Sequence, residues 1–489
     1  MGARIQDRLL SILPRGALLL SVLTLASYVM GLVRDRVFAR TFGASSELDV
    51  YNAALVLPEL ALDVLVIAGL SAAFVPVFAR LRREEAAGGH PILGAQRNGG
   101  PQRNGEPQRN GGPERHEPLQ RDGVTERGDG TQDFARTVLT VSVLVMIVTV
   151  AILFVLAGEA VSLVAPGFDA AERALYIELF RVMCVTAIIF AASFALGEML
   201  VVRQRFFAYG LAPILYNTGI VLGTVVLGPS LGILGAAIGT VMGALMHLGI
   251  RIVDVARTDF RYRPALTLRS SGFREYVRLV IPRAVSAPIE PLIFLFFTSV
   301  ASSLAEGSIS AVSFARNFQS VPVSLIGVAF SVAAFPVMAA AVAAGDRARF
   351  TRLVATNLTT ITVLSIVAAV GLGLVGGLAI ETFLGGEAFD AQDVATTTML
   401  LGAFALSVPL EAVSQLLARA VYSTHNTILP VTASIAGVIV TVAVVELLAD
   451  AQGLVALPLG FAAGLATRVV LLLVALLLRL RSVGYLRAA

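Results

Sequence analysis

Apolar residues form long, nearly uninterrupted runs along most of the chain, and short polar stretches separate them. A helix needs about 20 mainly apolar residues to cross the hydrocarbon core of a bilayer. We expect every run of that length to be a membrane-spanning helix, and the pattern therefore predicts an all-α polytopic membrane protein with about twelve spans. The twelve runs lie near residues 17–42, 50–80, 135–157, 173–203, 207–228, 232–254, 277–304, 308–341, 352–384, 394–420, 428–448 and 453–478.

Charge alternates between the loops on the two sides of the predicted spans. Arginines such as Arg80, Arg203 and Arg347 follow even-numbered segments, whereas acidic residues such as Glu159 and Glu306 follow odd-numbered ones. Basic residues concentrate in cytoplasmic loops, so the alternation predicts that both termini are cytoplasmic. Composition agrees with a lipid environment, because only 14% of the residues are charged, against about 25% in soluble domains.

Residues 84–133 interrupt the apolar pattern. Gln96-Arg97-Asn98-Gly99-Gly100-Pro101 is followed by two related hexapeptides, at 102–107 and 108–113. A tract rich in Gly, Pro and Asn cannot bury enough apolar surface to fold. We therefore predict a disordered cytoplasmic insert, with arginine contacts to anionic lipid as the alternative.

An internal repeat becomes visible when the insert is set aside. The stretch 71–77, Ser-Ala-Ala-Phe-Val-Pro-Val, resembles the stretch 331–337, Ser-Val-Ala-Ala-Phe-Pro-Val. Two six-helix halves related by an axis along the membrane normal are found in transporters, which bind substrate between the halves. We expect five parts: 1–83, the first two spans; 84–133, the insert; 134–258, spans three to six; 259–276, a cytoplasmic linker; and 277–482, the second bundle.

Several ionisable residues fall within the predicted spans, where they are costly and by default face a cavity or pore. Prolines 282, 288 and 291 interrupt segment seven around two of them. The set predicts a hydrated, net cationic cavity between segments one, two, seven and eight. Buried ion pairs are the alternative for the deeper residues, and snorkelling to the interface is the alternative for Arg40 and Asp49. The charged candidates are Arg34, Asp35, Arg40, Asp49, Glu59, Arg283, Glu290 and Arg316.

No catalytic or metal-binding pattern accompanies these charges. The single cysteine, Cys184, lies in an apolar run, and the four histidines are scattered. The sequence also lacks a Gly-x-x-x-x-Gly-Lys phosphate loop. We therefore expect a protein that is not an enzyme and holds no metal, cofactor or nucleic acid. A coupling ion is left open among Na⁺, H⁺ and Cl⁻.

Motifs in the first two segments carry a resemblance to a known family. They read Gly31-Leu32-Val33-Arg34-Asp35, Ala39-Arg40-Thr41-Phe42-Gly43-Ala44, Asp49, Leu57-Pro58 and Ser71-x-Ala73-Phe74-Val75-Pro76, with Pro322 and Pro336 in segment eight. In order and spacing they resemble the MurJ (MviN) lipid II flippases of the MATE-like, or MOP, exporter superfamily.

The resemblance implies two six-helix bundles in the bacterial cytoplasmic membrane. It also implies export of an undecaprenyl-pyrophosphate-linked peptidoglycan precursor, lipid II, by alternating access, with membrane lipids and cell-wall synthesis or division proteins as partners. The cavity set then comprises Arg34, Asp35, Arg40, Asp49, Glu59, Arg283, Glu290, Arg316 and Asn317, and the structural motif residues are Pro58, Ser71, Pro76, Pro322 and Pro336.

The chain departs from the family pattern in two motifs. In segment two, family members usually have an Arg-Arg pair and a following Glu-Gly, where this chain has Leu62-Asp63 and Ile67-Ala68. In segment eight, the usual Ala-Asp-Arg is replaced by Ala315-Arg316-Asn317. Family members commonly have fourteen spans. Three alternatives therefore stay open: a flippase for another polyprenyl-linked oligosaccharide, a MATE-like drug/ion antiporter, and a non-transporting scaffold that recruits partners through residues 84–133.

Overall fold

The computed structural model describes residues 15–86, 130–286 and 289–482, and this part of the chain is helical without β-strands. Twelve helical segments follow the twelve predicted runs, several of them broken into two or more helices. Eight helices in the described ranges are long and apolar enough to cross a membrane, or nine when the pair α16 and α17, bent by 41°, is taken as one span. The predicted polytopic α-helical fold is confirmed.

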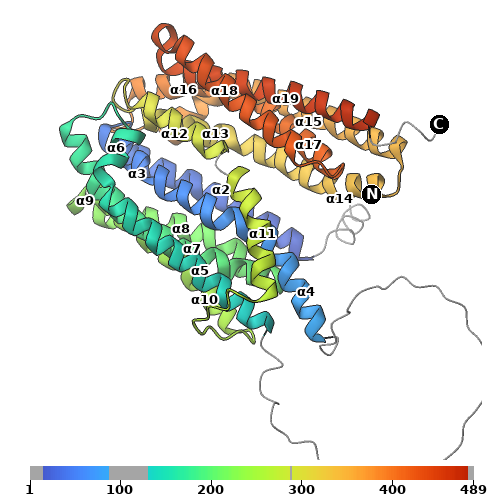
Figure 1. Ribbon diagram of the computed structural model, residues 1–489. Coiled ribbons are helices and arrows are strands. Elements are labelled where there is room, and N and C mark those ends of the chain that lie inside the picture. The colour runs from blue at the N-terminus through green and yellow to red at the C-terminus, as the bar shows by residue number, and fades with distance from the viewer. Residues whose placement is uncertain (1–14, 87–129, 287–288, 483–489) are drawn as a thin grey trace, which may run out of the picture.

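Six segments form the first bundle, coloured blue to green in Figure 1. Pro58 lies inside the second segment shortly before two π-helical turns, η1 and η2. The segments are α2 (Arg15–Phe42); α3 (Ser46–Leu62), η1 (Asp63–Ile67), η2 (Leu70–Phe74) and α4 (Val75–Ala86); α5 (Gly130–Val155); α7 (Ala170–Val202); α8 (Phe206–Leu222), η3 (Gly223–Leu227) and α9 (Gly228–Leu231); and α10 (Ile233–Ala256), with a short α6 (Ala157–Val164) between the third and fourth.

Six further segments follow, coloured yellow to red in Figure 1. The eighth segment repeats the irregularity of the second, because Pro322 ends α13 directly before the π-helical η4. The segments are α11 (Ser271–Ser286) and α12 (Ile289–Ala301); α13 (Ser308–Pro322), η4 (Val323–Val328) and α14 (Ala329–Ala343); α15 (Arg347–Phe383); α16 (Ala391–Ala405) and α17 (Ser407–Ser423); α18 (Ile428–Gln452) and η5 (Gly453–Val455); and α19 (Ala456–Ser482).

Helix packing in the two bundles follows the same plan, shifted by six segments. In the first bundle α10 packs on α8 and α7, and α7 packs on α5. In the second bundle the corresponding α19 packs on α18 and α17, and α17 packs on α15. Segments one and five also pair, as α2 with α8, and their counterparts do so as α12 with α18. This correspondence agrees with the two six-helix halves predicted from the repeated motif.

Glycines allow the closest helix pairs to form. Gly219 and Gly223 on the fifth segment face Gly243 and Gly239 on α10, and a Cβ atom added to Gly239 would lie 2.8 Å from the Cα atom of Gly223. Small residues spaced by four let helix backbones approach closely in lipid, where apolar burial does not drive helices together. Gly437 and Gly464 repeat this arrangement between α18 and α19.

Segment seven connects the two bundles. Its first helix, α11, packs on η1, η2, α4 and α5 of the first bundle, whereas its second helix, α12, packs on α18 and α13 of the second bundle and on α3 and α6 of the first. The first part of segment seven therefore packs on the first bundle, whereas its second part contacts both bundles. The boundary predicted at residue 277 remains a prediction of domain organisation.

The predicted insert lies mostly outside the described residues. The flanking helices extend into both ends of the insert, because α4 continues to Ala86 and α5 begins at Gly130. The backbone N–H of Thr131 donates to the Glu85 carboxylate over 2.6 Å. The two helices that flank the insert are thus held together at its base.

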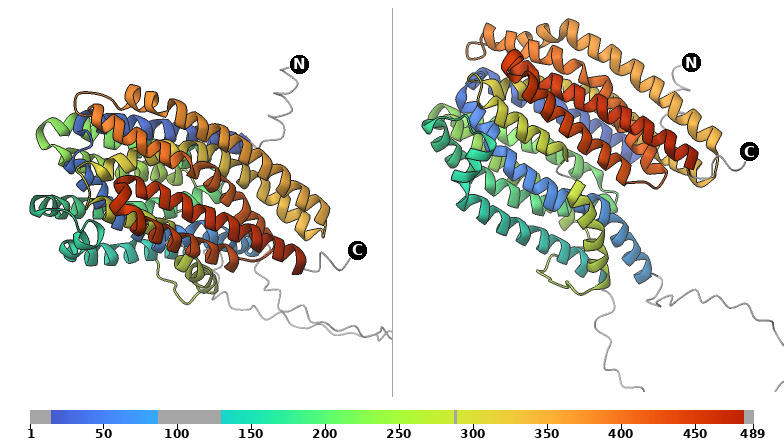
Figure 2. Two further views of the ribbon diagram at one scale, coloured as in Figure 1. Left: turned by 90° about the horizontal axis from the view of Figure 1, so that it is seen from above. Right: turned by 45° about the horizontal axis from the view of Figure 1, so that its top comes forward.

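The bundles contact each other mainly at one end of the molecule, which we call the closed end. Helices α6, α3 and α12 meet there, at the left in Figure 1, while α4 and α14 lie at the opposite end. The two views of Figure 2 show the same two groups of helices running side by side along their length. The main helix contacts between the bundles come from α12 and α13 against α2, α3 and α6.

Candidate transport cavity

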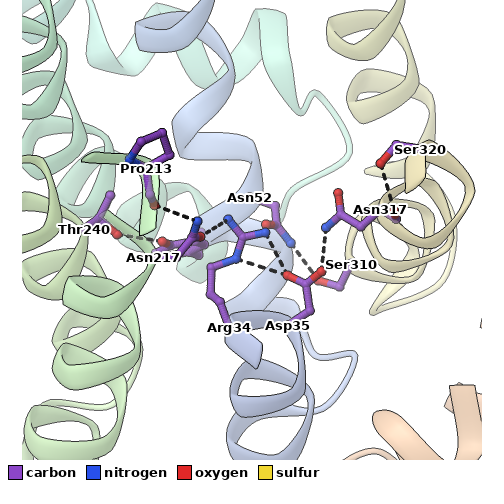
Figure 3. A network of polar contacts seen from close by, with 10 residues as sticks. Arg34, Asp35, Asn52, Pro213, Asn217, Thr240, Ser310, Asn317 and Ser320 are labelled. Atoms are coloured by element: carbon purple, nitrogen blue, oxygen red, sulfur yellow. Dashed lines mark hydrogen bonds and ion pairs between the residues drawn. The ribbon is translucent and has the colours of Figure 1, made fainter. Parts of the chain in front are cut away.

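Arg34 and Asp35 lie next to each other on α2 and form the centre of a polar network between the bundles. The Arg34 guanidinium donates to Asp35 Oδ1 from Nη2 over 2.8 Å and from Nε over 3.1 Å. Its Nη1 donates to Asn217 Oδ1 of α8 over 3.2 Å. Figure 3 shows the guanidinium between these two partners. The side chain is therefore fixed in orientation by two elements of its own bundle.

Asp35 connects this network to the second bundle. Its Oδ2 accepts a hydrogen bond from Asn317 Nδ2 of α13 over 2.9 Å, and the residue is only 2% exposed. The Arg34 side chain, in contrast, keeps 25% of its surface exposed. A guanidinium has five N–H donors, and these three hydrogen bonds use three of them. Two donors remain for a bound anion.

The exposed face of Arg34 lies in a cavity of about 360 Å³, which we call the deep chamber. Arg34, Asp35, Asn52, Glu59, Arg316 and Asn317 supply its polar lining, and Phe294 and Phe297 supply apolar wall. Its residues come from α2, α3, α12 and α13. These are segments one, two, seven and eight, so the cavity lies between the four segments that the sequence predicts.

A second cavity of about 620 Å³, the wide chamber, adjoins the deep chamber. Val56, Glu59 and Phe294 line both. Further along α3 and η1, Asp63 faces the wide chamber, and Arg468 of α19 and Tyr422 of α17 line it from the second bundle. The two chambers form one polar space that extends from the deep network along the second segment.

Hydrogen bonds close the end of the molecule beyond the deep chamber. Asp49 Oδ1 accepts from the backbone N–H and the hydroxyl of Ser310, over 2.7 and 2.6 Å, and Asn52 Nδ2 donates to the same hydroxyl over 3.3 Å. The backbone N–H of Ser46 donates to the Glu306 carboxylate over 3.0 Å. Because each of these bonds joins the two bundles, the closed end cannot open without breaking them.

Arg316 is engaged mainly within the second bundle. It forms a two-point ion pair with Glu411 of α17, with N–O distances of 2.9 and 3.0 Å. The rings of Phe294 and Phe461 cover the guanidinium at 5.4 and 5.0 Å. Arg316 also donates to Gln319. These contacts favour the alternative of a buried ion pair for this residue over that of a free cavity cation.

The structure brings five of the nine predicted cavity residues together, namely Arg34, Asp35, Glu59, Arg316 and Asn317. The others do not line either chamber in the described part of the chain. Arg40 is exposed at the end of α2, Asp49 is buried at the closed end, and Arg283 is exposed on α11. The side chain of Glu290 lies outside the described residues.

The motif residues have different surroundings. Pro58 is buried in α3, whereas Pro76 and Pro336 are exposed, and Pro322 is partly buried at the end of α13. Ser71 belongs to η2, and its side chain lies outside the described residues. Pro58 and Pro322 thus have the clearest structural role, since each precedes a π-helical turn, and the turn that follows Pro58 lines the wide chamber.

The expectation of a net cationic cavity is wrong for the lining that the structure describes. Three arginines, Arg34, Arg316 and Arg468, line the two chambers, and so do three carboxylates, Asp35, Glu59 and Asp63. The sequence analysis overlooked Arg468, although it is the only charged residue in the apolar run 453–478. It also missed the role of Asn217, which no pattern along α8 indicates.

Two similar bundles around a polar interbundle cavity define a membrane transporter of the MATE-like, or MOP, class. Among solved structures, the chain is similar to "Lipid II flippase MurJ, inward closed conformation", with a TM-score of 0.74 and 21% identity over 96% of this chain and 93% of that one. It is also similar to an inward-facing MATE multidrug transporter, with a TM-score of 0.73 and 14% identity over 95% and 96% of the two chains.

The chain belongs to the family described as lipid II flippase MurJ, whose sequence profile matches residues 118–487. A relative named "Probable lipid II flippase MurJ" from Bdellovibrio bacteriovorus is 25% identical, over 94% of this chain and 81% of the relative. The "Lipid II flippase MurJ" of Burkholderia cenocepacia is 22% identical, over 87% and 76%. The chain is therefore a multi-pass protein of the bacterial inner membrane.

Proposed function

We propose that this protein moves lipid II, an undecaprenyl-pyrophosphate-linked peptidoglycan precursor, across the cytoplasmic membrane by alternating access. The observation that carries the proposal is Arg34, which Asp35 and Asn217 fix in a chamber between the bundles while two of its N–H donors stay uncommitted. A guanidinium binds phosphate oxygens through two parallel hydrogen bonds. The pyrophosphate of lipid II is the matching anion.

The orientation of the protein completes this proposal. The arginine-rich loops support an orientation in which both termini and the end that carries α4 and α14 face the cytoplasm. The closed end, with the Asp49–Ser310 contact, then faces the other side. The described conformation is inward-facing, and export requires the closed end to open after the head group has entered.

The experiment that tests the proposal is depletion of the protein in its native host. Lipid-linked precursor should accumulate in the inner leaflet, because its synthesis continues while its export stops. A complementing copy with Arg34→Ala should leave the accumulation unchanged. Normal export of precursor in depleted cells would contradict the proposal.

A drug/ion antiporter is the second candidate, and two observations favour it. Unpaired carboxylates, Glu59 and Asp63, line the wide chamber, and the fold resembles a MATE transporter at a TM-score of 0.73. An antiporter of that kind would change the cellular accumulation of cationic drugs, whereas a flippase would change the leaflet distribution of precursor. Both quantities can be measured in the same depleted cells.

A further inference from the structure

The wide chamber has carboxylates on one side and an arginine on the other. Glu59 of α3 and Asp63 at the start of η1 come from the first bundle, and Arg468 of α19 comes from the second. Tyr422 and Ser434 add polar groups on the side of Arg468. A space of about 620 Å³ between these walls is large enough for part of a polar head group.

The two carboxylates differ from the other acids of the interior in having no partner. Neither Glu59 nor Asp63 makes a hydrogen bond or ion pair with a described residue, whereas Asp35 is bound by Arg34 and Asn317, and Glu411 by Arg316. Glu59 is exposed to the cavity. Two like charges four residues apart on a helix repel each other. A cation bound between them would relieve that repulsion.

The surroundings favour an organic ammonium over a metal ion. Ca²⁺ takes six to eight oxygen ligands, and Mg²⁺ requires near-ideal octahedral geometry. The described residues contain no group of three acidic, histidine or cysteine side chains that could hold a metal ion. A primary ammonium carries three N–H donors and a single charge, which two carboxylates in a wide chamber can satisfy.

The position of the pair relative to Arg34 agrees with a single extended ligand. Glu59 lines both chambers, and Arg34 lines the deep one. From Asn52 in the deep chamber, the segment rises by roughly 10 Å to Glu59 and roughly 16 Å to Asp63 at 1.5 Å per residue. A head group made of pyrophosphate, two sugars and a peptide extends over a comparable length. A phosphate on Arg34 therefore leaves its peptide within reach of the carboxylates.

We propose that Glu59 and Asp63 bind the side-chain ammonium of a diamino acid in the peptide of the transported head group and so select lipid-linked precursors that carry a free amine. This inference rests on the proposed function and adds a specificity site to it. The carboxylates recognise the peptide, while Arg34 recognises the anion that all such precursors share.

The test compares two lipid II probes that differ only in this amine, one free and one N-acetylated, in proteoliposomes that contain the full-length protein. The unchanged protein should move the free-amine probe roughly tenfold faster, since loss of one charge-assisted contact changes affinity by about that factor. The double variant Glu59→Gln/Asp63→Asn should reduce the ratio of the two rates to about one, and each single variant should reduce it in part.

Rates should be normalised to the amount of inserted protein, so that a poorly folding variant does not affect the ratio. Glu159→Gln serves as the matched control, because Glu159 is an exposed acid on α6, outside both chambers. It should keep the tenfold ratio. Equal movement of both probes by the unchanged protein, or a tenfold ratio in the double variant, would overturn this inference alone. No movement of either probe by the unchanged protein would overturn the proposed function as well.

Discussion

At the scale of single residues, the cavity contains arginines in two different roles. Arg34 is partly exposed and keeps donors for a ligand, whereas Arg316 is enclosed by Glu411, Gln319 and two phenylalanine rings. Their partners distinguish the two residues, although the sequence presents both only as arginines within apolar segments. The difference leads to separate predictions for activity and for stability.

Replacing Arg34 should slow transport strongly. Loss of its charge-assisted hydrogen bonds to pyrophosphate should slow lipid II movement by roughly 10- to 100-fold in Arg34→Ala, and Arg34→Lys should recover only part of the rate, since an ammonium is a point charge without the planar fork. Flipping in proteoliposomes measures the effect. Arg40→Ala is the control, because Arg40 lies outside both chambers. Equal losses in the two alanine variants would argue against the assignment of Arg34.

Removing one partner of the Arg316–Glu411 pair should destabilise the second bundle. An uncompensated buried charge costs about 3–5 kcal/mol, whereas an apolar replacement of both partners is often neutral. Glu411→Leu should therefore lower the midpoint of thermal unfolding, and Arg316→Met/Glu411→Leu should regain most of the loss. The unfolding of purified protein in detergent provides the measurement. If the double variant is as unstable as the single one, the uncompensated charge of Arg316 is not the reason why Glu411→Leu loses stability.

Single-residue roles could be predicted from the sequence only in part. Depth in a span and the Gly31–Asp35 motif identified Arg34 and Asp35, which the structure places in the chamber. The roles of Asp49 and Arg316 depend on partners 261 and 95 residues away. No local pattern reveals such partners, so the sequence left open whether Asp49 lines the cavity or lies at the interface, and whether Arg316 lines the cavity or forms a buried ion pair.

At the scale of helices, glycine spacing determines how closely the fifth and sixth segments pack. Gly239→Ala should destabilise the first bundle by about 1–3 kcal/mol, because the added methyl group would overlap the backbone of Gly223. Gly249→Ala, on the same helix, has open space at its Cβ position and should be neutral or stabilise by up to about 1 kcal/mol. Thermal unfolding of the two variants tests the pair. An equal change in stability for the two variants would show that helix propensity, and not close packing, determines the effect of the substitution.

Deleting most of the insert should leave folding and transport intact. The Thr131–Glu85 hydrogen bond holds the ends of α4 and α5 together, so a short linker in place of residues 88–128 can join them without moving either helix. Membrane levels and flipping of the deletion variant provide the measurement. Normal levels with complete loss of function would favour the scaffold alternative.

The segments themselves were largely predictable, because each needs only a sufficient length of apolar sequence. The breaks within them were predictable only where prolines mark them, as in segment seven. Hydropathy does not distinguish a π-helical turn such as η4 from regular α-helix, and it gave no sign that α11 packs on the first bundle while α12 contacts both. Such breaks depend on tertiary contacts, and the mean hydropathy of a segment carries no information about those contacts.

At the scale of the whole molecule, polar contacts at the closed end join the two bundles, and the chambers lie between the bundles further along. Alternating access requires these contacts to break during each cycle. Asn52 Nδ2 and the hydroxyl of Ser310 lie 3.3 Å apart across this junction. The only cysteine in the chain, Cys184, is fully buried and can be replaced by alanine to give a clean background.

The most direct measurement is therefore lipid II flipping by an Asn52→Cys/Ser310→Cys variant in proteoliposomes, before and after treatment with a short bis-methanethiosulfonate cross-linker that reductant removes. Cross-linking should stop flipping and reductant should restore it, while both single-cysteine variants should stay active after treatment. If the fully cross-linked protein moves lipid II as fast as its reduced form, the head group does not pass between the two bundles by opening of the closed end.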